Sequence, residues 1–247
     1  MKIGVLTDSS SYLTKEQCEK YGIDVLPIPI IWDNKEYLDL IDIGFHEFYE
    51  KLSTSSTLPT TSQPSTGTVK KYVDKYIDEG YTDLIIITLS SGISSFYNNV
   101  LSVADEESRI NIHPFDCKIT CAGEANAAIL AGRLVKAGAD IDLIMHDLKD
   151  LRNTTDVRFM VANLNHLKRT GRLSNAASFD EEREAEWVSD YESSFPKVKI
   201  YQSIIGPVVG VHVGQHTMAM IWGRDLDSYF DENGKPIKDI KSKVVED

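Results

Sequence analysis

Short apolar runs alternate with amphipathic segments along the first two thirds of the chain. Runs rich in β-branched residues predict strands at 2–6, 23–32, 83–89 and 110–115. Segments with apolar residues at helical spacing lie between and after these runs, at 14–22, 44–53, 68–80, 94–107, 121–138 and 141–153. Strands that alternate with helices are typical of βαβ units around a buried, largely parallel sheet. The pattern therefore predicts an α/β fold for this part of the chain.

The pattern changes in the last third of the chain. Strand-like runs at 156–162, 197–205 and 217–223 stand beside only two helical patterns. This mixture indicates a smaller lobe of the α+β type. We therefore predict two lobes, a parallel-sheet α/β lobe over residues 1–155 and an α+β lobe over residues 156–247.

Polar loops follow three of the predicted strands. Their sequences are "TDSS" at 7–10, "LSSGIS" at 89–94 and "FDCK" at 115–118. The carboxyl ends of parallel strands meet at one edge of a sheet, and open α/β sheets bind their ligands at that edge. We therefore expect the three loops to lie together beside a ligand.

The stretch "STLPTTSQPSTGTVKKYV", residues 56–73, is rich in hydroxyl side chains ahead of a helical pattern. This composition fits either a flexible linker or a polar loop that holds a ligand. Because the stretch comes before strand 83–89 completes the sheet, we interpret it as a loop of the first lobe. The backbone N–H groups that begin the next helix would suit an anion, although Ser65 and Thr66 could serve only to cap that helix.

A second group of hydroxyls, Ser90, Ser91, Ser94 and Ser95 around Gly92, stands where another helix is predicted to begin. This serine loop also suits an anion, or it only caps the helix. The chain has no GK[ST] ending of a P-loop, no G-x-G-x-x-G and no G-x-S-x-G. Neither nucleotide binding nor the nucleophile elbow of a hydrolase is therefore indicated.

Basic side chains gather at "LKRTGRLS" in the predicted second lobe. Lys168, Arg169 and Arg172 surround a glycine-containing turn. They either complement the dipole at a helix end or, in the case of Arg172, pair bidentately with a carboxylate or phosphate.

The segment "IGPVVGVHVGQHTMAM" places His212 among glycines at 206, 210 and 214. We predict a strand here, in which glycines mark bulges or a close approach of the backbone to another group. A zinc site with His216 is not expected, because no Cys or carboxylate lies nearby at ligand spacing.

Composition narrows the class of protein. The 247 residues are 42% hydrophobic with a mean hydropathy of -0.23, which is typical of a globular protein. A formal net charge of -12 disfavours nucleic acid and anionic membranes as partners. The N-terminus turns polar by Thr7 and no apolar run approaches a membrane span, so we expect a cytoplasmic protein. Cys18, Cys117 and Cys121 are expected to be buried free thiols.

Five segments, in this order, carry a resemblance: "TDSSSYL", "TTSQPS", "LSSGIS", "LKRTGRLS" and "GPVVGVHVG". Together they resemble the DegV family, bacterial fatty-acid-binding proteins that serve as the lipid-holding subunit of fatty acid kinase. The likeness spans most of residues 1–222. It implies a monomeric, two-lobed protein that holds a long-chain fatty acid between its lobes and presents the carboxylate to a separate kinase subunit. It implies no cofactor, no metal and no catalytic activity of its own. The residues that the resemblance assigns to the carboxylate are Thr61, Ser62, Ser90, Ser91, Ser94, Arg172 and His212.

Two other functions stay open from the residues alone. One is a hydrolase or phosphotransferase acting on an acyl substrate, with a loop serine as nucleophile and His212 as base. The missing elbow motif and the lack of an evident Asp to orient His212 weigh against it. The other is a flavodoxin-like cofactor binder, which the alternation of strands and helices permits but no motif supports.

Two departures of the chain from the family pattern bear on the site and on the second lobe. Where the family commonly reads S-G-T-Y after the serine loop, this chain has Ser94-Ser95-Phe96-Tyr97, which predicts a bulky ring near the head-group pocket. The segment after Phe179 runs directly into an acidic helix, where the family usually has strands and a hairpin. Part of the second lobe is therefore expected to be missing. An Asn-Gly turn signal at 233–234 is similar in type to the absent hairpin, so deletion and relocation both fit.

Overall fold

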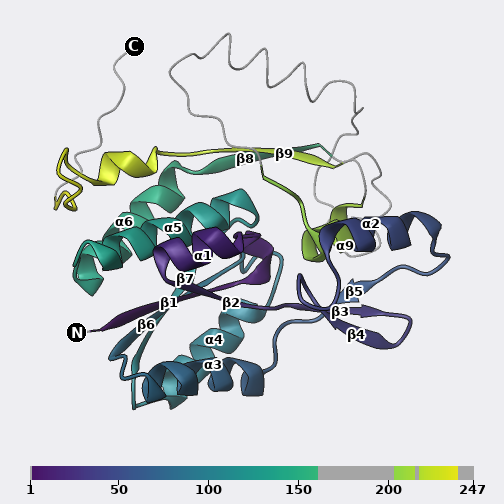
Figure 1. The fold of residues 1–247 in the computed structure, drawn as a ribbon, viewed down its shortest axis with the longest axis horizontal. Coiled ribbons are helices and arrows are strands. Elements are labelled where there is room, and N and C mark those ends of the chain that lie inside the picture. The colour runs from purple at the N-terminus through teal and green to yellow at the C-terminus, as the bar shows by residue number, and fades with distance from the viewer. Residues whose placement is uncertain (1, 161–202, 215–216, 239–247) are drawn as a thin grey trace, which may run out of the picture.

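A computed structural model describes residues 2–160, 203–214 and 217–238 (Figure 1). Four parallel strands form its central sheet in the order β2-β1-β6-β7. Their bounds are β1 Ile3–Asp8, β2 Ile23–Leu26, β6 Asp83–Thr88 and β7 Asn111–Asp116. All residues of β1 and β6 are buried, as expected for the inner strands of a sheet that is covered on both faces. The predicted α/β class is confirmed.

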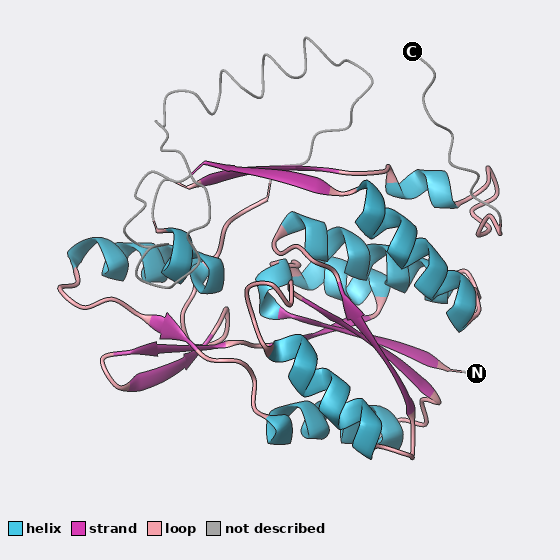
Figure 2. Cartoon of the chain, turned by 180° about the vertical axis from the view of Figure 1, so that it is seen from behind, coloured by secondary structure: helices cyan, strands magenta, loops and turns pink. Residues whose placement is uncertain are grey.

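Helices cover both faces of this sheet, as Figure 1 and Figure 2 show from opposite sides. One face carries α3 (Thr66–Asp78) and α4 (Phe96–Glu106), and the other carries α1 (Lys15–Tyr21), α5 (Ala122–Lys136) and α6 (Ile141–Thr154). Each face has its own apolar core. Alternate residues of β6 enter the two cores, because successive side chains of a strand point to opposite faces.

A three-stranded antiparallel sheet, in the order β4-β3-β5, lies beside the central sheet (Figure 1). Its strands are β3 (Pro29–Trp32), β4 (Lys35–Leu38) and β5 (Thr60–Thr61). Helix α2 (Phe45–Thr54) lies between β4 and β5 in the chain. The prediction of one strand over 23–32 is wrong, because the chain leaves the central sheet after Leu26 and enters this sheet at Pro29. Pro27 separates the two strands, since proline has no backbone N–H to donate to a ladder.

The described C-terminal part contains a two-stranded antiparallel sheet of β8 (Asp156–Met160) and β9 (Met218–Trp222), and a helix α9 (Pro207–Val213). The predicted strand around His212 is wrong, since this segment forms α9. Proline at the first helical position has the φ angle that a helix needs, and the helix buries its valines in two apolar clusters. That burial outweighs the preference of β-branched residues for strands. The basic turn with Arg172 lies outside the described residues.

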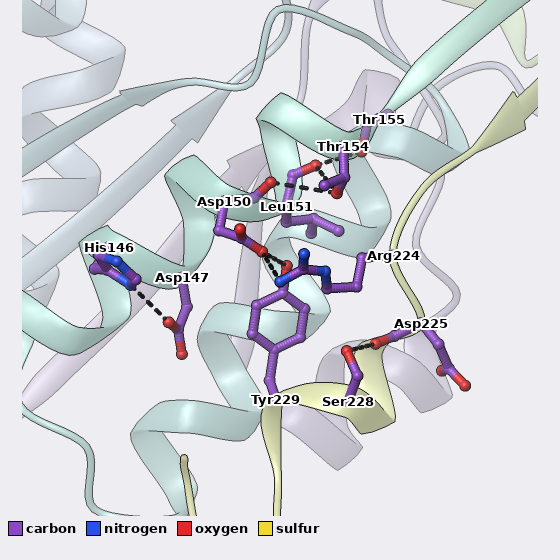
Figure 3. Close-up of polar contacts among 10 residues, drawn as sticks. All are labelled: His146, Asp147, Asp150, Leu151, Thr154, Thr155, Arg224, Asp225, Ser228 and Tyr229. Atoms are coloured by element: carbon purple, nitrogen blue, oxygen red, sulfur yellow. Dashed lines mark hydrogen bonds and ion pairs between the residues drawn. The ribbon is translucent and has the colours of Figure 1, made fainter. Parts of the chain in front are cut away.

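The segment after β9 is attached to α6 by a cluster of polar contacts (Figure 3). Arg224 Nη1 lies 2.7 Å from Asp150 Oδ2, and Tyr229 Oη donates to the same oxygen at 2.7 Å. Tyr229 is fully buried in the core on this face of the sheet. Asp150 therefore joins the end of the described chain to the first-lobe helices.

The Asn-Gly turn signal corresponds to a turn in the structure. Gly234 has a φ of 74°, in the left-handed region that glycine enters without strain, and an isolated bridge joins Phe230 to Pro236. The turn lies beyond η2 (Leu226–Tyr229), a short 3-10 helix.

The boundary between two lobes at residue 155 stays a prediction. Helix α9 belongs to the predicted second lobe, yet it packs against β3, β5 and α2 of the first. In the part of the chain that the structure describes, we find no helix with the length and apolar character needed to cross a membrane.

Candidate ligand-binding site

The loops after β1, β6 and β7 meet at one edge of the central sheet, as predicted. Leu89 N, just after β6, donates a hydrogen bond to Asp8 Oδ2 at 2.9 Å. Ser91 N and Ser91 Oγ donate to the two carboxylate oxygens of Asp116, at 3.1 and 2.5 Å. These bonds join the ends of neighbouring strands and hold the serine loop in place.

Thr61 and His212, which are 151 residues apart in sequence, are in direct contact. A hydrogen bond of 2.8 Å joins Thr61 Oγ1 and His212 Nε2. Pairing of Thr61 with Ile30 positions the threonine on β5, and a backbone bond from Ser62 N to Pro29 O extends that pairing by one residue. His212 comes from the last turn of α9. The contact therefore connects the hydroxyl-rich loop to a helix from the far end of the chain.

Two tyrosines that the sequence analysis did not single out attach α9 to the first lobe. Tyr12 Oη accepts a hydrogen bond from Val209 N at 3.0 Å, and Tyr49 Oη donates to Ile205 O at 2.9 Å. Burial raises the pKa of both phenols, so the hydroxyls stay neutral donors or acceptors. Tyr12 lies in the segment "TDSSSYL", but neither tyrosine stood out, because a tyrosine in the sequence is more often an ordinary core residue.

Gly206, the residue before α9, and Gly210 within it allow this close packing. A Cβ atom on Gly206 would lie 2.2 Å from Tyr12 Cε1, and one on Gly210 would lie 2.6 Å from Tyr49 Oη. The prediction that these glycines mark a close approach of the backbone is confirmed, with aromatic side chains as the neighbours. The approach occurs on a helix instead of a strand.

The two hydroxyl-rich loops lie side by side. Ser95 Oγ donates to Gln63 Oε1 at 2.9 Å, and Asn99 Nδ2 donates to Pro64 O at 2.8 Å. Ser65 caps α3 by accepting a hydrogen bond from Thr68 N at 3.1 Å, so the capping role proposed for it is present. The neighbouring loops form one polar rim next to the start of α3 and α4.

The three predicted serines of the second loop differ in the hydrogen bonds that their hydroxyl groups make. Ser90 Oγ accepts from Gly92 N and Ser94 Oγ accepts from Phe96 N, each at 3.2 Å. Because a hydroxyl both donates and accepts, each keeps a proton to donate to a ligand. The proton of Ser91 is donated to Asp116. Ser90 and Ser94 are thus the better candidates for a carboxylate.

Phe96, the first residue of α4, turns its ring into the core, and the expectation of a bulky ring near the head-group pocket stays a prediction. Its side chain is 1% exposed and belongs to the core between the sheet and helices α3 and α4. An aromatic residue at the first position of a helix turns inward here because burial of the ring is strongly favourable.

The three thiols differ in burial. Cys117 and Cys121 are buried, and burial raises the pKa of Cys121 to about 12, which keeps it neutral. Cys18 is only half-buried, which corrects the expectation for it. Across the described ranges, the His, Cys, Asp and Glu side chains do not gather in threes as a metal site would need. His216 lies outside those ranges.

Buried carboxyl groups underlie this edge of the sheet and were not predicted. Asp39 is 1% exposed, and its Oδ2 accepts a hydrogen bond from Ser9 Oγ at 2.7 Å. Its other oxygen, Oδ1, has no hydrogen-bond partner in the described structure. Burial raises the pKa of Asp39 from 3.8 to about 7, because the ionised group loses its hydration and gains little in return.

The pKa of Asp39 predicts that stability falls as the pH rises. The folded protein binds the Asp39 proton more tightly than the unfolded chain, so this stabilisation is present in acid and is lost as the pH rises through about 7. Between pH 5 and pH 8, Asp39 is expected to lower the free energy of unfolding by roughly 2–3 kcal/mol. Urea unfolding at both pH values should show that the free energy of unfolding of Asp39→Asn depends less on pH than that of the wild type. Asp42→Asn, which alters an exposed carboxyl of the same loop, is the control, and equal slopes in all three proteins would refute the prediction.

Comparison with known proteins identifies the family. The fold is that of an α/β protein with hydroxyl loops at the carboxyl ends of a parallel sheet, the edge at which open α/β sheets bind ligands, and its sequence has no nucleotide motif. A family model described as "Uncharacterised protein, DegV family" matches residues 2–179, which is more than half of the chain. The protein belongs to the DegV family.

Relatives and solved structures agree with this assignment. A DegV domain-containing protein of Staphylococcus aureus (strain N315) is 32% identical over 231 residues, which cover 92% of this chain and 76% of the relative. The crystal structure of DegV from Bacillus subtilis, described as a fatty acid binding protein, has a TM-score of 0.83 at 26% identity and covers 91% of this chain and 100% of its own. A fatty acid binding DegV family protein from Streptococcus agalactiae, at 24% identity, has a TM-score of 0.80 and shares the fold.

The same comparisons bear on the length of the chain. The match to Protein DegV of Bacillus subtilis extends over 279 residues and covers 99% of that protein but 90% of this one. An alignment longer than this 247-residue chain means that the relative has residues that this chain lacks. The prediction that the missing part belongs to the second lobe stays a prediction.

Proposed function

We propose that this protein binds a long-chain fatty acid, with the carboxylate at the rim formed by the two hydroxyl-rich loops. The observation that carries the proposal is the contact between Thr61 and His212, which brings the opening loop and α9 to one point. Ser62, Ser90 and Ser94 supply further hydroxyls on the same loops. The description of the structurally similar Bacillus subtilis protein as fatty acid binding supports this reading.

The chemistry of the rim suits a carboxylate that must remain reactive. Neutral hydroxyls hold an anion without neutralising it, and each hydrogen bond to a charged group contributes about 1.5–3 kcal/mol. Most of the affinity then comes from the acyl chain, at about 0.8 kcal/mol per buried CH2. We assign the acyl chain to the apolar interior beside α9, where the buried Val208 and Val211 belong to one cluster and the buried Val209 belongs to another.

In this proposal the protein presents the carboxylate to a separate kinase subunit and catalyses nothing alone. Arg172, which the family resemblance assigns to the head group, would hold the carboxylate or the phosphate formed on it. The sequence has no nucleotide-binding motif of its own, so the phosphate donor would be bound by the partner.

One observation favours the hydrolase as a second candidate. A hydroxyl lies 2.8 Å from an imidazole at Thr61 and His212, which is the distance between a nucleophile and its base in acyl transfer. In a carrier, the same contact would instead orient the Thr61 hydroxyl and the His212 imidazole toward the bound carboxylate.

Extraction of the purified protein under denaturing conditions, followed by mass spectrometry, is expected to release a long-chain fatty acid. Added fatty acid is expected to raise the thermal midpoint, because it binds only the folded protein. The protein alone is expected neither to consume ATP nor to hydrolyse acyl esters. Ester hydrolysis that disappears in Thr61→Ala, Ser94→Ala or His212→Ala would support the hydrolase, and release of a flavin or nucleotide would support a cofactor binder.

A further inference from the structure

Buried polar groups at the end of β1 indicate a proton that is retained inside the protein. Ser10 Oγ lies 2.7 Å from Asp8 Oδ1 and 2.8 Å from Glu124 Oε2. A serine hydroxyl has one proton and donates to only one of these oxygens. The other contact is a hydrogen bond only when that carboxyl group is protonated and donates to Ser10 Oγ. One of the two carboxyl groups is therefore neutral.

The surrounding hydrogen bonds decide which carboxyl group is neutral. Asp8 accepts two backbone N–H groups, from Leu89 at 2.9 Å and from Ser10 at 3.0 Å, and such donors stabilise a carboxylate. Glu124 contacts the hydroxyl groups of Ser10 and Thr7, the latter donating to Glu124 Oε1 at 3.0 Å. It also shares a side-chain hydrogen bond with Asp8, which raises the pKa of Glu124 and lowers that of Asp8. Burial, together with the nearby charge of Asp8, raises the pKa of Glu124 well above its usual range. The proton therefore belongs on Glu124.

Among the residues that the structure describes, no positively charged side chain is paired with Asp8 or Glu124. The other titratable groups that face this pair of carboxyl groups are Asp39 from the loop after β4, and Cys117 and Cys121 from the segment before α5. All three become negative when they lose a proton. Ionisation of Glu124 would therefore place a second, uncompensated charge in the interior.

The pair is connected to the ligand-binding rim through η1 (Ser9–Ser11), a short 3-10 helix. Asp8 caps the start of η1, and Tyr12 ends it in a left-handed conformation with a φ of 52°. The hydroxyl of Tyr12 then accepts the N–H of Val209 in α9, the helix that carries His212. The position of η1 thus contributes to the position of α9.

We propose that Glu124, Ser10 and Asp8 form a relay that keeps one proton, with Glu124 Oε2 donating to Ser10 Oγ and Ser10 Oγ donating to Asp8 Oδ1, and that this relay positions η1 for the docking of α9. Glu124 acts as a positioning residue. Loss of its proton at alkaline pH separates the two carboxyl groups and loosens α9. The relay is independent of the proposed fatty acid, so its tests use the ligand-free protein.

Infrared spectroscopy tests where the proton lies. At pH 8 the wild-type protein is expected to show the carbonyl stretching band of a protonated carboxyl group, and Glu124→Gln is expected to lose the intensity of one such group. The glutamine NH2 still donates to Ser10 Oγ, so this variant keeps the bonds that hold η1. Asp39→Asn is the control and is expected to keep the Glu124 band. Absence of any such band in the wild type, or an unchanged band in Glu124→Gln, overturns the relay.

Amide hydrogen exchange tests the positioning role. The protection factor of the Val209 N–H is expected to fall in the wild-type protein as the pH becomes alkaline, and to stay constant in Glu124→Gln. A merely structural role of Glu124 would change the level of protection without changing its dependence on pH. The same pH dependence in both proteins, or constant protection in the wild type, overturns the link between the relay and α9.

Discussion

The double variant Thr61→Ala/Ser62→Ala is expected to bind a long-chain fatty acid roughly tenfold to a few hundredfold more weakly than the wild type. One lost hydrogen bond to a charged group costs about 1.5–3 kcal/mol, and about 1.4 kcal/mol corresponds to a factor of ten. The first substitution also removes the hydroxyl that contacts His212. Thr61 is half-buried and Ser62 is exposed, so the free energy of unfolding should change little. Displacement of a fluorescent fatty acid measures the change in affinity.

Thr60→Ala is the matched control for this variant. Thr60 is exposed and lies next to Thr61 on β5, where successive side chains point to opposite faces. It is expected to bind fatty acid with wild-type affinity. If the double variant also binds normally, the head-group assignment is wrong. If Thr60→Ala is weakened as much as the double variant, the effect belongs to the loop as a whole and not to the two hydroxyls.

Gly206→Ala is expected to destabilise the protein by about 1–3 kcal/mol, because it overpacks the contact between α9 and the first lobe. The new Cβ would lie 2.2 Å from Tyr12 Cε1, and Tyr12 is buried. Alanine accepts the backbone conformation of Gly206, with φ of -82°, so the cost comes from the steric clash alone. Urea unfolding measures the loss of stability, and weaker fatty acid binding is expected to accompany it because α9 carries His212.

A glycine in open surroundings provides the comparison. Gly67 lies in the first turn of α3, and a Cβ there would meet its nearest atom, Ser65 Oγ, at 3.8 Å. Gly67→Ala is expected to be neutral or stabilising by up to about 1 kcal/mol, since alanine favours helix more than glycine does. Equal stability of the two variants would mean that the Tyr12 ring moves aside without cost, and that α9 is not held as tightly as its hydrogen bonds indicate.

The amino-acid sequence by itself determined the class of the fold and the location of the polar loops. The α/β class follows from the alternation of apolar runs with helical patterns, because burial of apolar surface is encoded locally by spacing. The shared edge of the loops follows from the geometry of a parallel sheet, and the contact between Leu89 and Asp8 agrees with it. Five short segments in order were enough to identify the family.

The local sequence pattern predicted structure less reliably where one segment packs against several others. The valine-rich segment after Gly206 has strand propensity, yet it forms α9 because two apolar clusters bury it and Pro207 begins a helix. Glu124 had a visible signal, since it lies on the same face of α5 as the buried Ala127 and Ala128, but its partner was not identifiable. Spacing shows that a group is buried without showing what it is buried against.

Only the tertiary structure decided which of these groups meet. Thr61 and His212 are separated by 151 residues, and Tyr12 and Val209 by 197, so no local rule relates them. The docking of α9 depends on the absence of a Cβ at Gly206 and on a neutral tyrosine hydroxyl within hydrogen-bond distance. Such contacts arise from the packing of whole elements, whereas a sequence pattern records only the face that each element buries.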